Sequence, residues 1–241
     1  MDLKTRVFEI EAADTQYQAL KNLSKFLPKA EGGFFVIGIA LISYQLSWVG
    51  ELWRKEVSLL SQQLEEKIKS HCFFAGWKTI LKNSLYNKRL QNMKIKRLQR
   101  FLQWESFFFE NINVLEDLEL FNRWLSSLMN QSLDAKTIVF ATKIWWRRLR
   151  IFGKVDMFPF AIKIPVDSRW SRLFKGLGIE DKKLMQQHID RISVKLNIAP
   201  LHIDWIVWPI IGRESVNTLE DLFQLLESRL GISSYDNSPD F

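Results

Sequence analysis

Two lysines seven residues apart, Lys136 and Lys143, could supply amine chemistry. Asp134 is a good N-cap, and the stretch 135–152 contains no glycine or proline, so it predicts a helix. On that helix the lysines lie two turns apart on nearly one face, about 10 Å from each other. Lys136 falls in the first turn, where the helix dipole and a second ammonium favour loss of its proton. A neutral lysine amine is a nucleophile, so this spacing suits covalent catalysis.

The same residues also fit a simpler hypothesis, a basic and solvated helix face. That face would continue through Arg147, Arg148 and Arg150, with Phe140 as apolar cover between the two lysines. Spacing alone favours the solvated face, because charged helix faces are more common than nucleophilic lysines. The choice between them needs more of the chain than this helix.

Several further motifs follow one another in order along the chain. They are DTQYQAL at 14–20, SYQLSWVGELW at 43–53, the basic stretch beginning NKRL at 87–100, KTIVFATK at 136–143, IPVDSR at 164–169 and PLHIDWIVWPIIG at 200–212. Together they resemble the archaeal 8-oxoguanine DNA glycosylase family, called AGOG, a divergent branch of the helix-hairpin-helix glycosylases. The resemblance implies an all-α, two-lobed helix-hairpin-helix glycosylase architecture with a cleft between the lobes.

The resemblance also implies a reaction, excision of 8-oxoguanine from DNA followed by a lyase step. Lys136 would attack the sugar carbon of a flipped nucleotide to form a Schiff base, and β-elimination would then cut the strand. Asp167 would stabilise positive charge on the sugar and assist proton transfer. An N-capping role for Asp167 is the structural alternative, and both roles can hold together.

The family positions also suggest a pocket for the flipped base. Its residues would be Gln16, Trp53, Lys143, Asp204 and Trp208. Asp204 and Trp208 stand one helical turn apart after Pro200, where a carboxylate can bond a flat heterocycle and an indole can stack on it. The mechanism requires no metal and no organic cofactor.

The charge balance points to a polyanionic partner. Formal net charge is +7 and the pI is near 9.4. The resemblance implies DNA containing oxidised guanine as that partner, and the basic stretch would contact the DNA backbone through Lys88, Arg89, Lys94, Lys96 and Arg97. A solvated basic face explains that stretch equally well.

The polar turn 130–134 predicts a helical hairpin before the lysine helix, although the Gly-x-Gly turn of better-known glycosylases is absent.

A single cysteine, Cys72, bounds the redox chemistry. It excludes an internal disulfide and a four-cysteine iron–sulfur cluster, and it suggests a reducing compartment. No export signal opens the sequence, so we expect a cytoplasmic, nucleoid-associated monomer. The uncharged stretch Gly32–Gly50 is barely long enough for a membrane span, and burial inside a helical protein is the better interpretation.

Helical periodicity without sustained β alternation predicts about a dozen helices. We expect a single helix-hairpin-helix glycosylase-like unit over 1–241, with a central lobe at roughly 55–150. The N- and C-terminal segments would form the other lobe, and 233–241 would be a disordered tail. Two alternatives remain open: a monofunctional glycosylase in which Asp167 activates water, and a non-catalytic, basic, helical nucleic-acid-binding protein.

Overall fold

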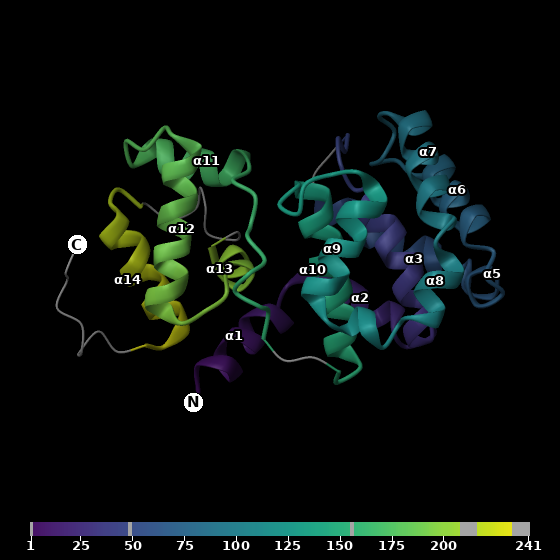
Figure 1. Cartoon of the computed structure of the whole chain (residues 1–241), viewed down its shortest axis with the longest axis horizontal. Coiled ribbons are helices and arrows are strands. Elements are labelled where there is room, and N and C mark those ends of the chain that lie inside the picture. The colour runs from purple at the N-terminus through teal and green to yellow at the C-terminus, as the bar shows by residue number, and fades with distance from the viewer. Residues whose placement is uncertain (1, 48–49, 155–156, 208–215, 233–241) are drawn as a thin grey trace. The chain divides into compact units, whose positions relative to one another are not determined.

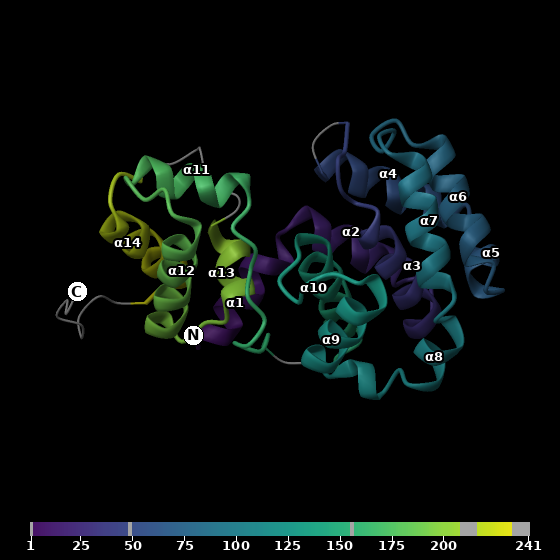
Figure 2. The ribbon, with the colours of Figure 1, turned by 45° about the horizontal axis from the view of Figure 1, so that its top comes forward.

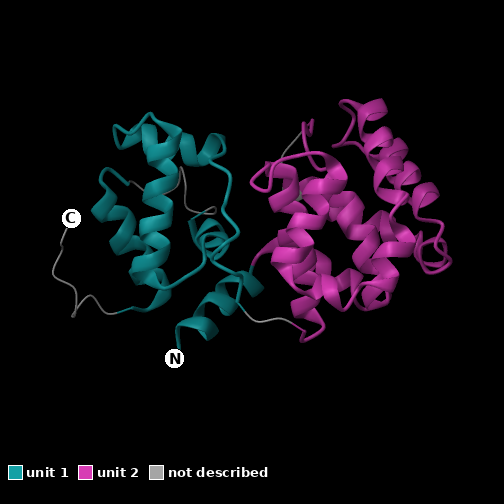
Figure 3. Cartoon of the chain, in the orientation of Figure 1, with its two compact units in different colours: residues 1–13, 157–241 teal, residues 14–156 magenta. Residues whose placement is uncertain are grey.

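The computed structural model describes residues 2–47, 50–154, 157–207 and 216–232, and this part of the chain is all-α (Figure 1). Contacts divide the chain into two units, drawn in Figure 3: unit 1 holds Met1–Ala13 and Met157–Phe241, and unit 2 holds Asp14–Asp156. Residues 14–54 therefore cluster with the central segment, whereas we had expected the central lobe to begin near residue 55. The predicted disordered tail, 233–241, lies outside the described residues.

Unit 2 is built from consecutive helices. They are α2 (Thr15–Leu23), α3 (Lys29–Leu41), α4 (Gly50–Gln62), α5 (Glu65–Lys69), α6 (Phe73–Asn83), α7 (Gln91–Leu102), α8 (Glu105–Glu110), the 3-10 helix η1 (Val114–Glu116), α9 (Leu118–Met129) and α10 (Lys136–Ile151). Residues 32–41 of the uncharged stretch lie in α3, which runs through the middle of unit 2 and packs on α10, α6 and α7 (Figures 1 and 2). The prediction of burial within a helical protein is confirmed for this helix.

Two glycines let the neighbouring helices approach α3 closely. A Cβ at Gly33 would lie 2.4 Å from Cζ3 of Trp145, and one at Gly38 would lie 2.4 Å from Cε2 of Trp77. Around Phe34 on the same helix, aromatic rings stack and meet edge to face, including that of Phe101 at a centroid distance of 4.4 Å. The close contact of Gly33 with Trp145 packs α3 directly on α10, the helix that carries the lysines.

Unit 1 contains α1 (Leu3–Ala12), α11 (Ser168–Gly176), α12 (Lys182–Leu196), α13 (Pro200–Val207) and α14 (Leu219–Leu230). The N-terminal helix α1 packs on α13 and α14, and Nε of Arg6 donates to the carbonyl oxygen of Arg229 at 3.0 Å. Many helices of the chain have an N-cap residue whose side chain accepts a hydrogen bond from a backbone N–H of the first turn. These N-caps are Asp2, Asp14, Asp117, Asp167, Asp181 and Thr218.

Some boundaries differ from those expected. The sequence predicts an entry segment and one helix over 1–30, but residues 3–12 already form a helix of their own, α1. The amphipathic pattern of residues 55–77 predicts one helix, but the chain there is divided among α4, α5 and α6, because Leu64 leaves helical geometry and His71 adopts a left-handed φ of 60°. No helix of the described residues combines the length and apolar character that crossing a bilayer needs.

Candidate active site

Lys136 is the first residue of α10, and its side chain is exposed. The predicted cap at Asp134 is wrong: the N-cap is Ala135, which has no side-chain acceptor for the first-turn amides. The reason is a tight turn in which the N–H of Ala135 donates to the carbonyl of Ser132 at 3.0 Å. This turn places Asp134 outside the helix and leaves Lys136 next to its uncapped, positive end.

The predicted helical hairpin is present between α9 and α10. Asn130 ends α9 in the left-handed conformation with φ 51°, so an asparagine takes the place that glycine has in other hairpins. The hydroxyl of Ser126 donates to the carbonyl of Gln131 at 2.5 Å, and Oγ1 of Thr137 donates to Oε1 of Gln131 at 2.8 Å. The turn is therefore fixed by side chains from both helices.

Lys143 and the two residues Arg147 and Arg148 lie further along α10, and all three side chains are buried. The exposed fraction is 8% for Lys143 and 0% for each arginine. The alternative of a solvated basic face through Arg147 and Arg148 is therefore wrong. Buried arginines need partners for their charge and donors. Arg148 donates to Oγ of Ser24 at 2.6 Å, and burial lowers its pKa to about 10.

Arg147 joins α10 to the start of α2. Its NH1 donates to Oε1 of Gln16 at 2.5 Å, and its NH2 lies 3.3 Å from Oδ2 of Asp14. The other oxygen of Asp14, the N-cap of α2, accepts from the backbone N–H of Gln16 at 2.5 Å. Burial alone would raise the pKa of Asp14, but Arg147, the Gln16 amide, Lys143 and Arg54 together lower it below its ordinary value. Asp14 is therefore a carboxylate among cations.

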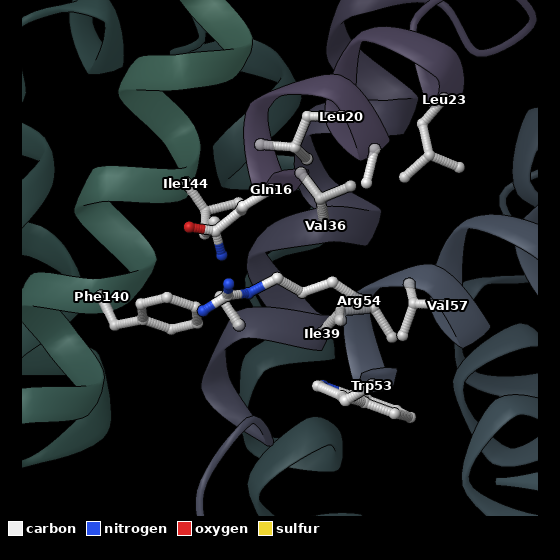
Figure 4. Close-up of a pocket in the computed structure, with 12 residues that line it drawn as sticks. Gln16, Leu20, Leu23, Val36, Ile39, Trp53, Arg54, Val57, Phe140 and Ile144 are labelled. Atoms are coloured by element: carbon white, nitrogen blue, oxygen red, sulfur yellow. The ribbon is translucent and has the colours of Figure 1, made fainter. Parts of the chain in front are cut away.

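Gln16 and Trp53 line the same pocket inside unit 2 (Figure 4). Its cavity volume is about 40 Å³, and the space widens to about 400 Å³ when the open solvent at its mouth is included. The walls are Gln16, Trp53, Arg54, Phe140 and aliphatic side chains of α2, α3, α4 and α10. Trp53 is 1% exposed and its Nε1 donates to Oγ of Ser43 at 2.8 Å, which fixes the indole plane. We call this cavity the Gln16 pocket. Its lining is mostly apolar with a few polar groups, which is the common character of ligand sites.

In unit 1 Asp167 and Asp204 share one partner, Trp170. Asp167 is the N-cap of α11, and its Oδ1 accepts from the backbone N–H groups of Arg169 at 2.9 Å and Trp170 at 3.2 Å. The indole Nε1 of the same Trp170 donates to Oδ1 of Asp204 at 2.9 Å. Trp170 is 1% exposed. It therefore fixes both carboxylates, which are half-buried.

The remaining predicted residues fall into three groups. Trp208 lies outside the described residues. Lys88, Arg89 and Lys96 are exposed, as a phosphate contact requires. Lys94 is fully buried, and its ammonium donates to Oδ1 of Asn87, so we withdraw it as a phosphate contact.

Arg97 is half-buried. Its NH1 donates to the carbonyl of Leu41 at 3.1 Å, which ties α7 to the end of α3.

Four residues of these arrangements were not singled out from the sequence: Asp14 as an ion-pair partner, Arg54, Arg147 and Trp170. For Arg147 a signal was available, because it follows Lys143 by one turn and so shares its buried face. Asp14 opens the motif DTQYQAL, which suggests a helix cap and no ion pair. Nothing in the sequence pairs Arg54 or Trp170 with a pocket or a carboxylate.

The chain is similar in sequence to a family of DNA-processing enzymes. The family model described as AGOG, N-glycosylase/DNA lyase, matches residues 2–236. An N-glycosylase/DNA lyase of Methanococcus maripaludis is 34% identical over 229 residues, 90% of this chain and 87% of that protein. One of Methanopyrus kandleri is 32% identical over 210 residues, 85% of this chain and 83% of that protein.

A solved structure is also similar in fold. It is a crystal structure of the 8-oxoguanine DNA glycosylase Pa-AGOG from Pyrobaculum aerophilum in complex with 8-oxoguanosine. The match has a TM-score of 0.67 and 23% identity, and covers 97% of this chain and 92% of that one. The all-α fold predicted from the sequence is therefore found in a solved structure.

Proposed function

Because this chain belongs to the AGOG family of N-glycosylase/DNA lyases, we propose that it excises 8-oxoguanine from DNA and then cleaves the strand at the abasic site. The observation that carries this proposal is the position of Lys136, an exposed amine at the uncapped start of α10. The 8-oxoguanosine bound to the Pyrobaculum protein supports the choice of base.

The chemistry begins at the anomeric carbon of a nucleotide that has left the base stack. The neutral amine of Lys136 forms a bond to C1′, and the base departs with the electron pair of the glycosidic bond. Opening of the sugar ring gives a protonated Schiff base. Loss of a proton from C2′ then expels the 3′ phosphate, which cuts the strand on the 3′ side of the lesion.

The Asp167 carboxylate would stabilise positive charge on the sugar and assist the proton transfers. Its two backbone hydrogen bonds orient it, so such a charge would meet a fixed acceptor.

Recognition of the base is assigned to Gln16, Trp53, Lys143, Asp204 and Trp208. Asp204 accepts hydrogen bonds only, so it suits N–H groups of the base, and Lys143 can donate to a carbonyl. Trp53 offers an indole face to the Gln16 pocket. Exposed Lys88, Arg89 and Lys96 would add salt-dependent contacts to phosphate.

Borohydride trapping on a duplex containing 8-oxoguanine tests this function. We expect a covalent adduct and strand cleavage from the wild-type chain, and neither from Lys136→Gln, which still binds the lesion duplex. The matched control is Lys182→Gln, since Lys182 is likewise the exposed first residue of a helix, α12. This control should react as the wild type does.

Two outcomes would contradict the proposal in different ways. Excision without an adduct would indicate a monofunctional glycosylase in which Asp167 activates water. Binding without excision would indicate a non-catalytic DNA-binding protein.

A further inference from the structure

The contact between Arg147 and Gln16 settles how the glutamine amide is oriented. Gln16 is 4% exposed and Arg147 is 0% exposed, so water does not compete freely for the hydrogen bond between them. A guanidinium carries only donors, and therefore the Gln16 atom at 2.5 Å from NH1 has to be the oxygen. The amide nitrogen then points away from Arg147. Figure 4 shows it directed into the Gln16 pocket, toward Arg54 and Phe140.

Asp14 holds this arrangement from the other side. One carboxylate oxygen lies 3.3 Å from NH2 of Arg147, and the other accepts the backbone N–H of Gln16. Arg147 therefore contacts both the Asp14 carboxylate and the Gln16 side-chain amide. Asp14 contacts both Arg147 and the backbone N–H of Gln16. Rotation of the amide would replace the hydrogen bond from NH1 of Arg147 with a contact between two donors, and it would leave a buried guanidinium donor without its acceptor.

We propose that Asp14 and Arg147 are positioning residues that fix the Gln16 amide with its N–H donors in the pocket, so that Gln16 recognises a carbonyl oxygen of the base. This inference rests on the proposed function, in which Gln16 contacts the flipped base. It excludes Gln16 as the acceptor for N7–H, the donor that distinguishes 8-oxoguanine from guanine. That proton has to be recognised by an acceptor elsewhere in the protein.

Gln16→Glu is the sharpest test, because it keeps the shape and the acceptor for Arg147 but replaces the pocket donors with an acceptor. We expect excision of 8-oxoguanine to fall on the order of 100-fold, because a base carbonyl then faces a carboxylate. Cleavage of a preformed abasic site, which has no base to hold, should fall much less. Excision at the wild-type rate, or faster, would overturn the inference, since only a glutamine that accepts from the base tolerates this change.

The second test asks whether Arg147 acts through Gln16. Arg147→Met should lower excision relative to abasic-site cleavage, and Arg147→Lys should restore part of the loss by donating to the amide oxygen again. The double variant Arg147→Met, Gln16→Met should excise no more slowly than Gln16→Met alone. Additive losses, or equal losses on both substrates, would show that Arg147 supports only the fold.

Arg148→Met is the matched control, since Arg148 is as buried as Arg147 but donates to Ser24, Leu27 and Pro28. Its loss should lower the midpoint of thermal unfolding and reduce both substrate activities in parallel. A wild-type chain that does not excise 8-oxoguanine would overturn the proposed function and this inference together. If the wild-type chain excises 8-oxoguanine and Gln16→Glu does so at the same rate, the inference is overturned while the proposed function stands.

Discussion

At the scale of single residues, Asp167 is both a helix cap and the proposed electrostatic partner of the sugar. The two roles use different properties of one carboxylate. Capping needs an acceptor oxygen for the amides of Arg169 and Trp170, whereas stabilisation of a developing cation needs the negative charge. A substitution that keeps the acceptor and removes the charge separates them.

We therefore predict that Asp167→Asn keeps the wild-type unfolding temperature and slows excision at least about 100-fold. Asp167→Ala should slow excision similarly and also lose about 1 kcal/mol of stability with the cap. Single-turnover excision and thermal unfolding measure the two effects independently. A normal rate in Asp167→Asn would reduce Asp167 to a cap.

The candidate residues that the sequence supplies lie inside motifs that resemble the family, such as Lys136 in KTIVFATK and Asp167 in IPVDSR, and their roles stay predictions. The residues that could not be predicted act through tertiary contacts. Gln16 and Arg147 are 131 positions apart, and Trp170 and Asp204 are 34 apart. No local periodicity records such a pairing, because it depends on how helices pack after they form.

At the scale of elements, the uninterrupted stretch 135–152 was predicted as a helix, and it forms α10 (Lys136–Ile151). The failures are local breaks. Residues 62–73 keep an amphipathic pattern through two interruptions, so periodicity alone does not show where α4, α5 and α6 separate. The start of α10 was misplaced because Asp134, a residue type that favours caps, lies in the turn that precedes the helix.

The helix α7 shows how a basic stretch can have two environments. Lys96 is exposed, whereas Lys94, two positions earlier, is buried between Asn87 and the ring of Tyr44, whose centroid lies 5.1 Å from its Nζ. Arg97 also lies over that ring, at 5.0 Å. Burial lowers the pKa of Lys94 to about 8, so its charged form destabilises the fold at neutral pH.

The sign of the pH effect follows from linkage. Between pH 8 and the ordinary lysine pKa of 10.5 the unfolded chain holds the Lys94 proton more firmly, so this residue makes stability rise with pH. We predict that the wild-type chain gains about 2 kcal/mol from this residue between pH 7 and 9.5, and that Lys94→Met lacks the gain. Denaturant unfolding of both chains at the two pH values measures the difference. Parallel pH profiles would contradict the prediction.

At the scale of the whole molecule, the chain enters unit 1, builds unit 2 from one continuous segment and returns to unit 1. The all-α class was accessible from the sequence, but the assignment of residues 14–54 to the central segment was not. That assignment depends on long-range packing of α2 and α3 on α10, which composition and spacing do not encode.

The discontinuity of unit 1 has a consequence for synthesis on the ribosome. Because α1 emerges first but packs on α13 and α14, it has to wait for nearly the whole chain before it finds its partners. Residues 14–156 form one compact, continuous unit, so we expect them to fold while translation continues. We predict that nascent chains stalled just after residue 156 emerges resist protease over 14–156 while residues 1–13 are cut. Release of the complete chain should protect Val7 and Glu11, which are buried in the finished protein. Early protection of 1–13 would mean that α1 first docks somewhere other than its final place.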